Sequence, residues 1–304
     1  MDFGPHLMLA LIEGAVLSAV LALIASGLSL VFGVMRVVNV AHGEFYMLGA
    51  VGAWFVANTL GLGFIGALVL APLAIGALAA AADMTVLKRI DYDPERTIVA
   101  TIGLLYILQQ LTLMTYGPDA RPVEPPFNAR LALPWFEWGE DGFAIYWPWG
   151  LSVTTYKLFV IVAAIVVLLA LWAMMAKTKM GLTMRATQLD RETAQAFGIP
   201  VERVYAAVFG LGAALAALAG VLIVPIQQAH YLMGGEALLL SFIVVIIGGL
   251  GSLPGTLVAA VLIGMSDGII SVFFSPTLAK IIATLAVALV LVFRPQGLFG
   301  AKAR

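Results

Sequence analysis

The chain has 304 residues, of which 62% are hydrophobic and 11% charged, and its formal net charge is −1. Soluble domains carry about 25% charged residues, so this composition and a mean hydropathy of +1.05 exclude an ordinary soluble protein. The absence of cysteine excludes disulfides, thiolate metal sites and cysteine nucleophiles. About 190 apolar residues, at about 20 for each crossing, provide for roughly eight or nine spans. Continuous apolar runs at 158–176 and 281–293 exclude β-barrel strands, which alternate, and predict an all-α polytopic membrane protein.

Nine apolar segments are expected to span or half-span the membrane, forming a single transmembrane domain over residues 1–304. The first should be retained, because the N-terminal ten residues lack the basic region of a secretory signal. The segments 44–59 and 237–249 are short for a crossing, which favours half-helices or re-entrant segments inside a bundle. In chain order the nine are 7–34, 44–59, 62–82, 98–116, 151–175, 204–224, 237–249, 255–274 and 278–293.

The basic residues divide unevenly between the two sides of this topology, as the positive-inside rule expects of a membrane protein. The bias predicts an external N-terminus, a cytoplasmic C-terminus, an external loop at 117–150 and a cytoplasmic loop at 177–203. The inside group is Arg36, Lys88, Arg89, Arg96, Lys177, Lys179, Arg185, Arg191, Arg203, Arg294, Lys302 and Arg304, and the outside group is Arg121, Arg130, Lys157 and Lys280.

The cytoplasmic loop is the most polar stretch of the chain. Thr187 with Asp190 suggests a capping box, and Gly198 followed by Pro200 is a stop signal, so a helix is expected over about 188–197. Its predicted amphipathic face suits either a partner or the membrane surface, and a solvated loop helix is the alternative. That face would comprise Leu189, Thr193, Ala196 and Phe197.

Sequence signatures of enzymes are missing. No lysine follows a glycine, which excludes a Walker-type phosphate loop, and there is no Gly-x-Ser-x-Gly elbow. The histidines His6, His42 and His230 are too widely separated for a helical zinc motif. Neither an enzyme nor a cofactor is therefore expected.

Two carboxylates fall well inside predicted spans, Glu13 and Asp267. Burying an unpaired charge in hydrocarbon costs several kcal/mol by most estimates, so each should face the bundle interior or water, unless it sits near the interface. A proton relay would normally show more such groups, with basic partners in the same layer. Their scarcity argues against ion coupling.

Two short stretches are similar: Ala41 to Glu44, and Ala229 to Glu236, each placing Ala-His and then Gly-Glu before an apolar segment. Internal repeats are common in transporters, but two short pieces do not establish one.

Several motifs, in the right order from about residue 10 to 300, resemble the bacterial ABC-transporter permeases for branched-chain amino acids, most closely the H-type subunit. The cytoplasmic stretch Gly181 to Ala186, with Ala194 and Gly198-Ile199, resembles their cytoplasmic signature. Val31 to Met35 with Asn39 to Glu44 resembles their opening motif, and Phe293 to Gly300 their C-terminal ending.

The resemblance implies one permease half in the bacterial inner membrane, surrounded by lipid. Its expected partners are a second homologous permease, two cytoplasmic ATPases and an extracytoplasmic substrate-binding protein; a nucleic-acid partner is not expected. The loop helix would be the coupling helix that docks on an ATPase. Residues assigned to coupling are Gly181, Arg185, Ala186, Asp190, Ala194, Phe197, Gly198 and Ile199, and pathway candidates are Glu13, Asn39, His42, Glu44 and Asp267.

Alternatives remain open at this stage. Asn39, His42 and Glu44 fall near the cytoplasmic end of the predicted topology, where a structural cap is as plausible as substrate contact. Similar permeases serve urea or short amides instead of amino acids. A self-sufficient ion-coupled carrier or channel would use Glu13 and Asp267 as its relay, and a scaffold without a pathway is disfavoured by the Gly/Pro-interrupted spans.

Overall fold

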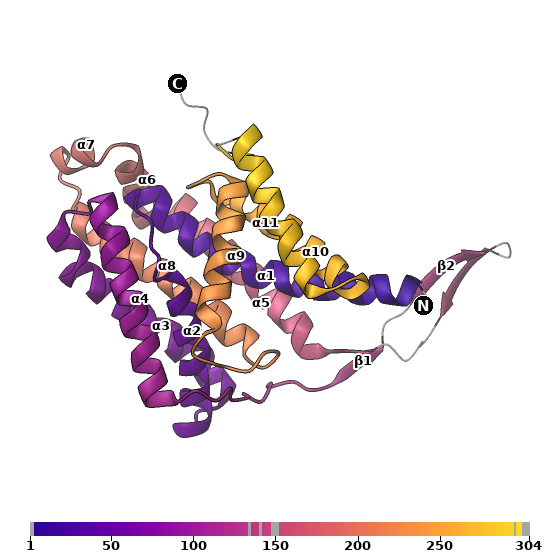
Figure 1. The fold of residues 1–304 in the computed structure, drawn as a ribbon. Coiled ribbons are helices and arrows are strands. Elements are labelled where there is room, and N and C mark those ends of the chain that lie inside the picture. The colour runs from indigo at the N-terminus through magenta and orange to yellow at the C-terminus, as the bar shows by residue number, and fades with distance from the viewer. Residues whose placement is uncertain (1–2, 133–134, 140–141, 147–151, 295, 300–304) are drawn as a thin grey trace.

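The computed structural model describes residues 3–132, 135–139, 142–146, 152–294 and 296–299, and they form an elongated helical bundle with a β-hairpin projecting from one end (Figure 1). Seven helices of this described part are long and apolar enough to cross a membrane, and an eighth apolar helix is shorter. The all-α polytopic fold predicted from composition is confirmed.

The first half of the chain runs to the end of the fourth long helix. Its elements are α1 (Phe3–Met35), α2 (His42–Trp54) with a π-helical turn (Phe55–Thr59), α3 (Gly63–Thr85), a 3-10 turn (Leu87–Ile90) and α4 (Pro94–Tyr116). The strands β1 (Arg130–Ala132) and β4 (Ser152–Thr154) pair antiparallel, as do β2 (Trp135–Gly139) and β3 (Gly142–Tyr146). The expected external loop therefore contains short strands, although its residues 147–150 lie outside the described part.

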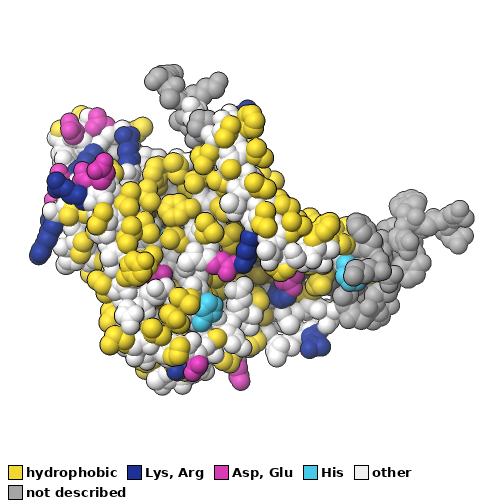
Figure 2. Space-filling model, viewed as in Figure 1, with side chains coloured by type: hydrophobic (Ala, Val, Ile, Leu, Met, Phe, Trp, Pro, Cys, Tyr) yellow, Lys and Arg dark blue, Asp and Glu magenta, His cyan; other side chains and the backbone are white. Residues whose placement is uncertain are grey.

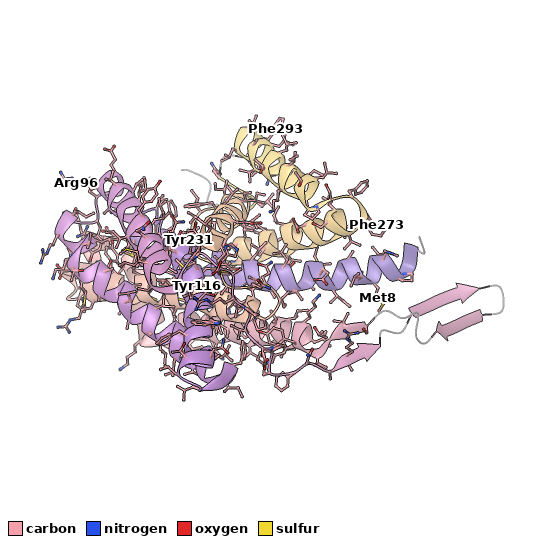
Figure 3. All side chains as sticks on the ribbon, turned by 60° about the horizontal axis from the view of Figure 1, so that its bottom comes forward. Met8, Arg96, Tyr116, Tyr231, Phe273 and Phe293 are labelled. Atoms are coloured by element: carbon pink, nitrogen blue, oxygen red, sulfur yellow. The ribbon has the colours of Figure 1, made fainter. Side chains whose placement is uncertain are left out.

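The second half begins with α5 (Thr155–Lys177), followed by the short helices α6 (Lys179–Leu189) and α7 (Arg191–Ala196). Four helices complete the bundle: α8 (Val201–Ile223), α9 (Met233–Gly248), α10 (Leu253–Phe273) and α11 (Pro276–Phe293). We call the end of the bundle that carries the strands the hairpin end, and the opposite end, with α6 and α7, the α7 end. Figure 3 shows Arg96 towards the α7 end and Met8 and Phe273 towards the hairpin end.

Each of the nine predicted segments contains a helix, although residues 152–154 of the fifth form β4, and both short ones are short helices, α2 and α9. The helix expected over 188–197 is wrong in its boundaries. Thr187 lies inside α6, where its hydroxyl donates to the carbonyl of Thr183 at 2.9 Å. Asp190 is the N-cap residue of the separate helix α7, and its carboxylate accepts from the backbone N–H of Thr193 at 3.1 Å.

The long helices of the two halves pack in antiparallel pairs. α1 runs from the hairpin end and lies along α10, whereas α8 runs the opposite way and lies along α3. α1 and α8 cross where Gly27 and Gly212 face one another, since a Cβ on either would press on the other's carbonyl oxygen.

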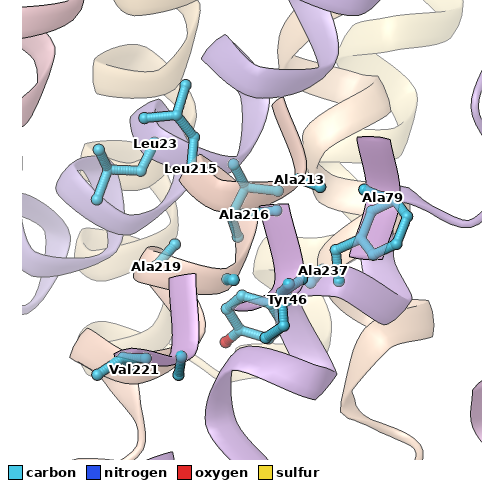
Figure 4. Packing of buried hydrophobic residues seen from close by; sticks show 14 of the residues in the cluster. Leu23, Tyr46, Ala79, Ala213, Leu215, Ala216, Ala219, Val221 and Ala237 are labelled. Atoms are coloured by element: carbon cyan, nitrogen blue, oxygen red, sulfur yellow. The ribbon is translucent and has the colours of Figure 1, made fainter. Parts of the chain in front are cut away.

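The core is built from small side chains around α8, the most enclosed spanning helix of the described part. Ala213, Ala216 and Ala219 are at most 1% exposed and pack against α1 and α2 (Figure 4). Bundles in membranes depend on such close packing, because lipid tails are as apolar as leucine and give helices little hydrophobic reason to associate.

The basic residues follow the predicted division. Those of the predicted inside group within the described residues lie on elements at the α7 end, and those of the outside group lie towards the hairpin end. Lys302 and Arg304 fall outside the described residues.

Candidate functional site

The first candidate site is the meeting point of α2 and α9, which we call the α2–α9 junction. Nε2 of His42 lies 2.9 Å from the backbone oxygen of Ile24. Ile24 precedes the end of α1 by 11 residues, or about 16 Å of helix. His42 therefore lies deep in the bundle, and residues 36–41 re-enter it from the α7 end. The sequence-based topology placed His42 too near the cytoplasmic end.

Glycine makes this junction possible. A Cβ on Gly43 would overlap the carbonyl oxygen of Gly234, and a Cβ on Gly234 would lie 2.8 Å from the carbonyl oxygen of Gly43. The first turns of α2 and α9 therefore touch backbone to backbone. Helix N-termini carry partial positive charge, and here two of them meet inside the bundle, each with a glutamate, Glu44 and Glu236, in its first turn.

The polar groups of the junction are enclosed. Asn39 is 1% exposed and its side-chain oxygen accepts from the backbone N–H of Ala41 at 3.0 Å. His42 and Glu44 are also at most 1% exposed. Their Nδ1 and Oε2 atoms make no hydrogen bond within the described structure. Because a buried unpaired polar group costs about 1–3 kcal/mol, this junction is more polar than packing alone requires.

The two carboxylates predicted inside spans both have basic neighbours. Glu13 forms an ion pair with Lys157 at the start of α5. Asp267 on α10 lies 3.3 Å from the hydroxyl of Ser271 and interacts electrostatically with Lys280 and Glu236. Both carboxylates therefore have basic partners that the sequence analysis did not identify. Sequence reasoning missed these partners because Lys157 and Glu13 are 144 positions apart and meet only through the fold.

The second candidate site is the surface of α6 and α7. Gly181 lies against the backbone oxygens of Met174 and Met175, where a side chain would not fit. Arg185 donates to the oxygen of Met175, and the oxygen of Ala186 accepts from the N–H of Asp190 at 3.2 Å. These residues hold α6 against the end of α5, so their role is to maintain the conformation of the loop.

α7 has one side buried against the bundle, while the residues that flank it are exposed. Ala194 is 4% exposed, and its backbone oxygen accepts from the N–H of Ile199 at 3.0 Å. Leu189, the last residue of α6, and Phe197, the residue after α7, flank this helix and are 80% and 83% exposed. Gly198 closes the helix at φ +83°, the left-handed conformation expected of a C-terminal glycine. The outward apolar pair, rather than Ala194, is available to a partner.

Arg191 anchors α7 to the bundle. Its guanidinium lies 2.9 Å from the carboxylate of Asp91 and over the rings of Tyr92 and Tyr205, at 5.5 and 5.7 Å from their centroids. Tyr92 and Tyr205 meet edge to face at 4.6 Å, and the Tyr92 hydroxyl donates to the fully buried Asp83 on α3 at 3.3 Å. A movement of α7 would therefore reach both α3 and α8. Sequence analysis did not single out any residue of this cluster for function.

A cavity of about 580 Å³ opens beside this surface, between the end of α1, α6 and the turn that joins α9 to α10. Arg36 and Arg185 give it a basic lining, and Arg36 donates to the backbone oxygen of Gln188 at 3.3 Å. Among the titratable groups of the loop, Asp190 has a pKa below its ordinary value, because the backbone N–H and the hydroxyl of Thr193 both donate to its carboxylate.

Sequence comparisons with known proteins agree on one family. The profile of "Branched-chain amino acid transport system / permease component" matches residues 10–292. The permease protein LivH of the high-affinity branched-chain amino acid transport system of Escherichia coli is 28% identical, over 95% of this chain and 94% of LivH. The permease protein LivM of the same system is 24% identical, over 94% of this chain and 69% of LivM. A structure of PsaBC from Streptococcus pneumoniae in complex with Fab has a similar fold, with a TM-score of 0.51 and 13% identity over 94% of this chain and 92% of that one.

Proposed function

We propose, for a chain that belongs to the family of branched-chain amino acid transport permeases, that it forms half of the membrane pathway of an ATP-binding-cassette importer. It is a multi-pass protein of the bacterial inner membrane. The substrates are branched-chain or related amino acids. The observation that carries the proposal is the match of the family over residues 10–292, together with an exposed, rigidly held helix at one end of the bundle.

The α7 end faces the cytoplasm in this proposal and the hairpin end faces outwards. The charge distribution supports it, because the basic residues gather on the elements of the α7 end and cytoplasmic loops are rich in lysine and arginine. An external binding protein then meets the hairpin end, and the ATPases meet α6 and α7.

α7 is the coupling helix. Leu189 and Phe197 supply the apolar contact with an ATPase, since large exposed apolar groups flanking one short helix suit a docking surface. Arg191 transmits the movement, because it connects α7 to Asp91 and to the aromatic rings that contact α3 and α8. Rigid-body movement of these helices switches access from one side of the membrane to the other.

The assembly contains two permease subunits, of which this chain is one, two ATPases and the external binding protein. Asn39, His42 and Glu44 do not line the pathway, because each is at most 1% exposed. They hold the first turns of α2 and α9 in place rather than contacting a passing solute.

The proposal is tested on the tagged chain expressed with its neighbouring transport genes. Leu189→Ser/Phe197→Ser should lose the ATPases on purification and lose most ATP-driven uptake of labelled leucine. Phe274→Ser is the matched control, since Phe274 is 75% exposed but lies at the hairpin end, and it should retain the ATPases. Retention of ATPases and full uptake by the double variant would remove α7 from the interface. Uptake by the chain alone, driven by an ion gradient, would replace the proposal with a carrier.

A further inference from the structure

Three ionisable side chains from three helices come together on one exposed face, and we call them the α9–α11 charge cluster. Oε1 of Glu236 on α9 lies 2.5 Å from Nζ of Lys280 on α11, with side chains 58% and 52% exposed. Asp267, on α10 between them, interacts electrostatically with both. Of these three residues, the sequence indicated only Asp267 as a candidate. Glu236 and Lys280 come to lie beside it only in the folded chain.

The cluster lies within the membrane-spanning part of the bundle, nearer its hairpin end. Glu236 stands 12 residues before the end of α9, and Lys280 stands 13 residues before the end of α11. At 1.5 Å per residue, both are about 18–20 Å from the α7-end termini of their helices, which places them in the half of a roughly 30 Å bilayer core that is nearer the hairpin end. Figure 2 shows a few charged and histidine side chains at the centre of this face, surrounded by hydrophobic ones.

Half-exposed charges at this depth are costly against lipid tails, so this face meets water or a neighbouring subunit rather than lipid. A lysine near a helix end would otherwise extend its side chain to the membrane surface. Lys280 instead points to Glu236. The cluster also holds two carboxylates and one lysine, so Lys280 neutralises only one of the two negative charges.

Apolar surface adjoins the cluster. A shallow depression of about 340 Å³ on the surface of α11 is lined by Lys280 together with Thr277, Ile281, Thr284 and Leu285. Leu239, one turn along α9 from Glu236, is 58% exposed. Gly235, the residue before Glu236, is exposed and has open space where a side chain would stand. A small solute can therefore reach the first turn of α9. A positive group, negative groups and an aliphatic surface together complement a small solute that carries a negative group, a positive group and an aliphatic side chain.

We propose that the α9–α11 charge cluster binds the head group of a free aliphatic amino acid in transit. Lys280 and the first turn of α9 receive the carboxylate, and Glu236 and Asp267 receive the ammonium group. The side chain lies along Leu239, Ile281 and Leu285. This inference rests on the proposed transport function, and it favours amino acids over urea or short amides, since a neutral solute would leave the paired charges without a role.

The test is photocrosslinking of the purified full assembly with a diazirine analogue of leucine, followed by peptide mapping. The label should fall within 232–243 and 277–289 and be competed by leucine but not by urea or acetamide. Glu236→Gln and Lys280→Met should each reduce labelling by about tenfold or more, as expected for loss of one charge-assisted contact. The control pair Lys88→Met and Glu202→Gln, which removes an equally exposed ion pair at the α7 end, should not change it.

Charge reversal separates recognition from structure. In Glu236→Lys/Lys280→Glu the ion pair is preserved, so a purely structural pair predicts normal labelling and uptake, whereas recognition of the head group predicts that both stay low. Lys280→Arg keeps the charge and should keep labelling, which controls for misfolding.

The outcomes also distinguish the two proposals. Wild-type ATP-driven leucine uptake with label elsewhere, or with label unaffected by Glu236→Gln and Lys280→Met, overturns the cluster but leaves the transport function standing. A wild-type assembly that takes up no amino acid overturns the transport function itself.

Discussion

Gly43→Ala tests the backbone contact at the α2–α9 junction. The new Cβ would overlap the carbonyl oxygen of Gly234 and stand 2.8 Å from Cβ of Leu238, well inside the 3.4–4 Å of ordinary contact. The two helices must then separate, which for an overpacked interior costs about 1–3 kcal/mol. Gly52→Ala is the matched control on the same helix, because its Cβ would meet Ala71 at an ordinary 3.4 Å.

The comparison of the two variants isolates the clash. Alanine gains roughly 0.8–1 kcal/mol of helix propensity over glycine, so Gly52→Ala should be neutral or slightly stabilised. Gly43→Ala should be about 1–3 kcal/mol less stable than Gly52→Ala. The assay is the free energy of unfolding, from titration with sodium dodecyl sulfate in mixed micelles. Equal stability of the two variants would refute the described approach of α2 and α9.

Two further predictions concern α7. The pKa of Asp190 is depressed, so the stabilisation that its carboxylate gives should be present above the ordinary aspartate pKa of about 3.9 and lost as the pH falls through the folded value. Amide exchange of α7 should accelerate there in the wild type but vary less in Asp190→Asn, which caps without charge; the same profile in both would contradict this. Gly198→Val should lose ATP-driven uptake at normal membrane abundance, because a left-handed φ of +83° costs an L-residue roughly 1–2 kcal/mol or more, whereas Gly198→Asn should retain it. Equal uptake by the two would show that the conformation is dispensable.

The helices were predictable because hydrocarbon forces apolar segments to satisfy their own backbone. The short segments 44–59 and 237–249 correctly indicated short helices. What the sequence did not reveal was their depth. Residues 36–41 read as an ordinary loop, and only the contact between His42 and Ile24 shows that they re-enter the bundle.

The candidate sites were predicted unevenly for similar physical reasons. The family motifs located α6 and α7, but Thr187 and Asp190 can both cap a helix, and packing of α6 on α5 decided between them. The charged partners of Glu13 and Asp267 escaped notice because spacing along the chain says nothing about distant helices. Lys280 was placed at the outer side by its position near a span end, but its ion pair with Glu236 on α9 shows only in the fold.

The central claim is that this chain works as one permease in a larger ATP-driven assembly. The most direct measurement is affinity purification of the tagged chain from its native host in mild detergent, followed by mass spectrometry of what remains bound. The account predicts recovery of a second permease and two Walker-motif ATPases. Recovery of this chain alone, folded and able to transport in liposomes without ATP, would contradict it.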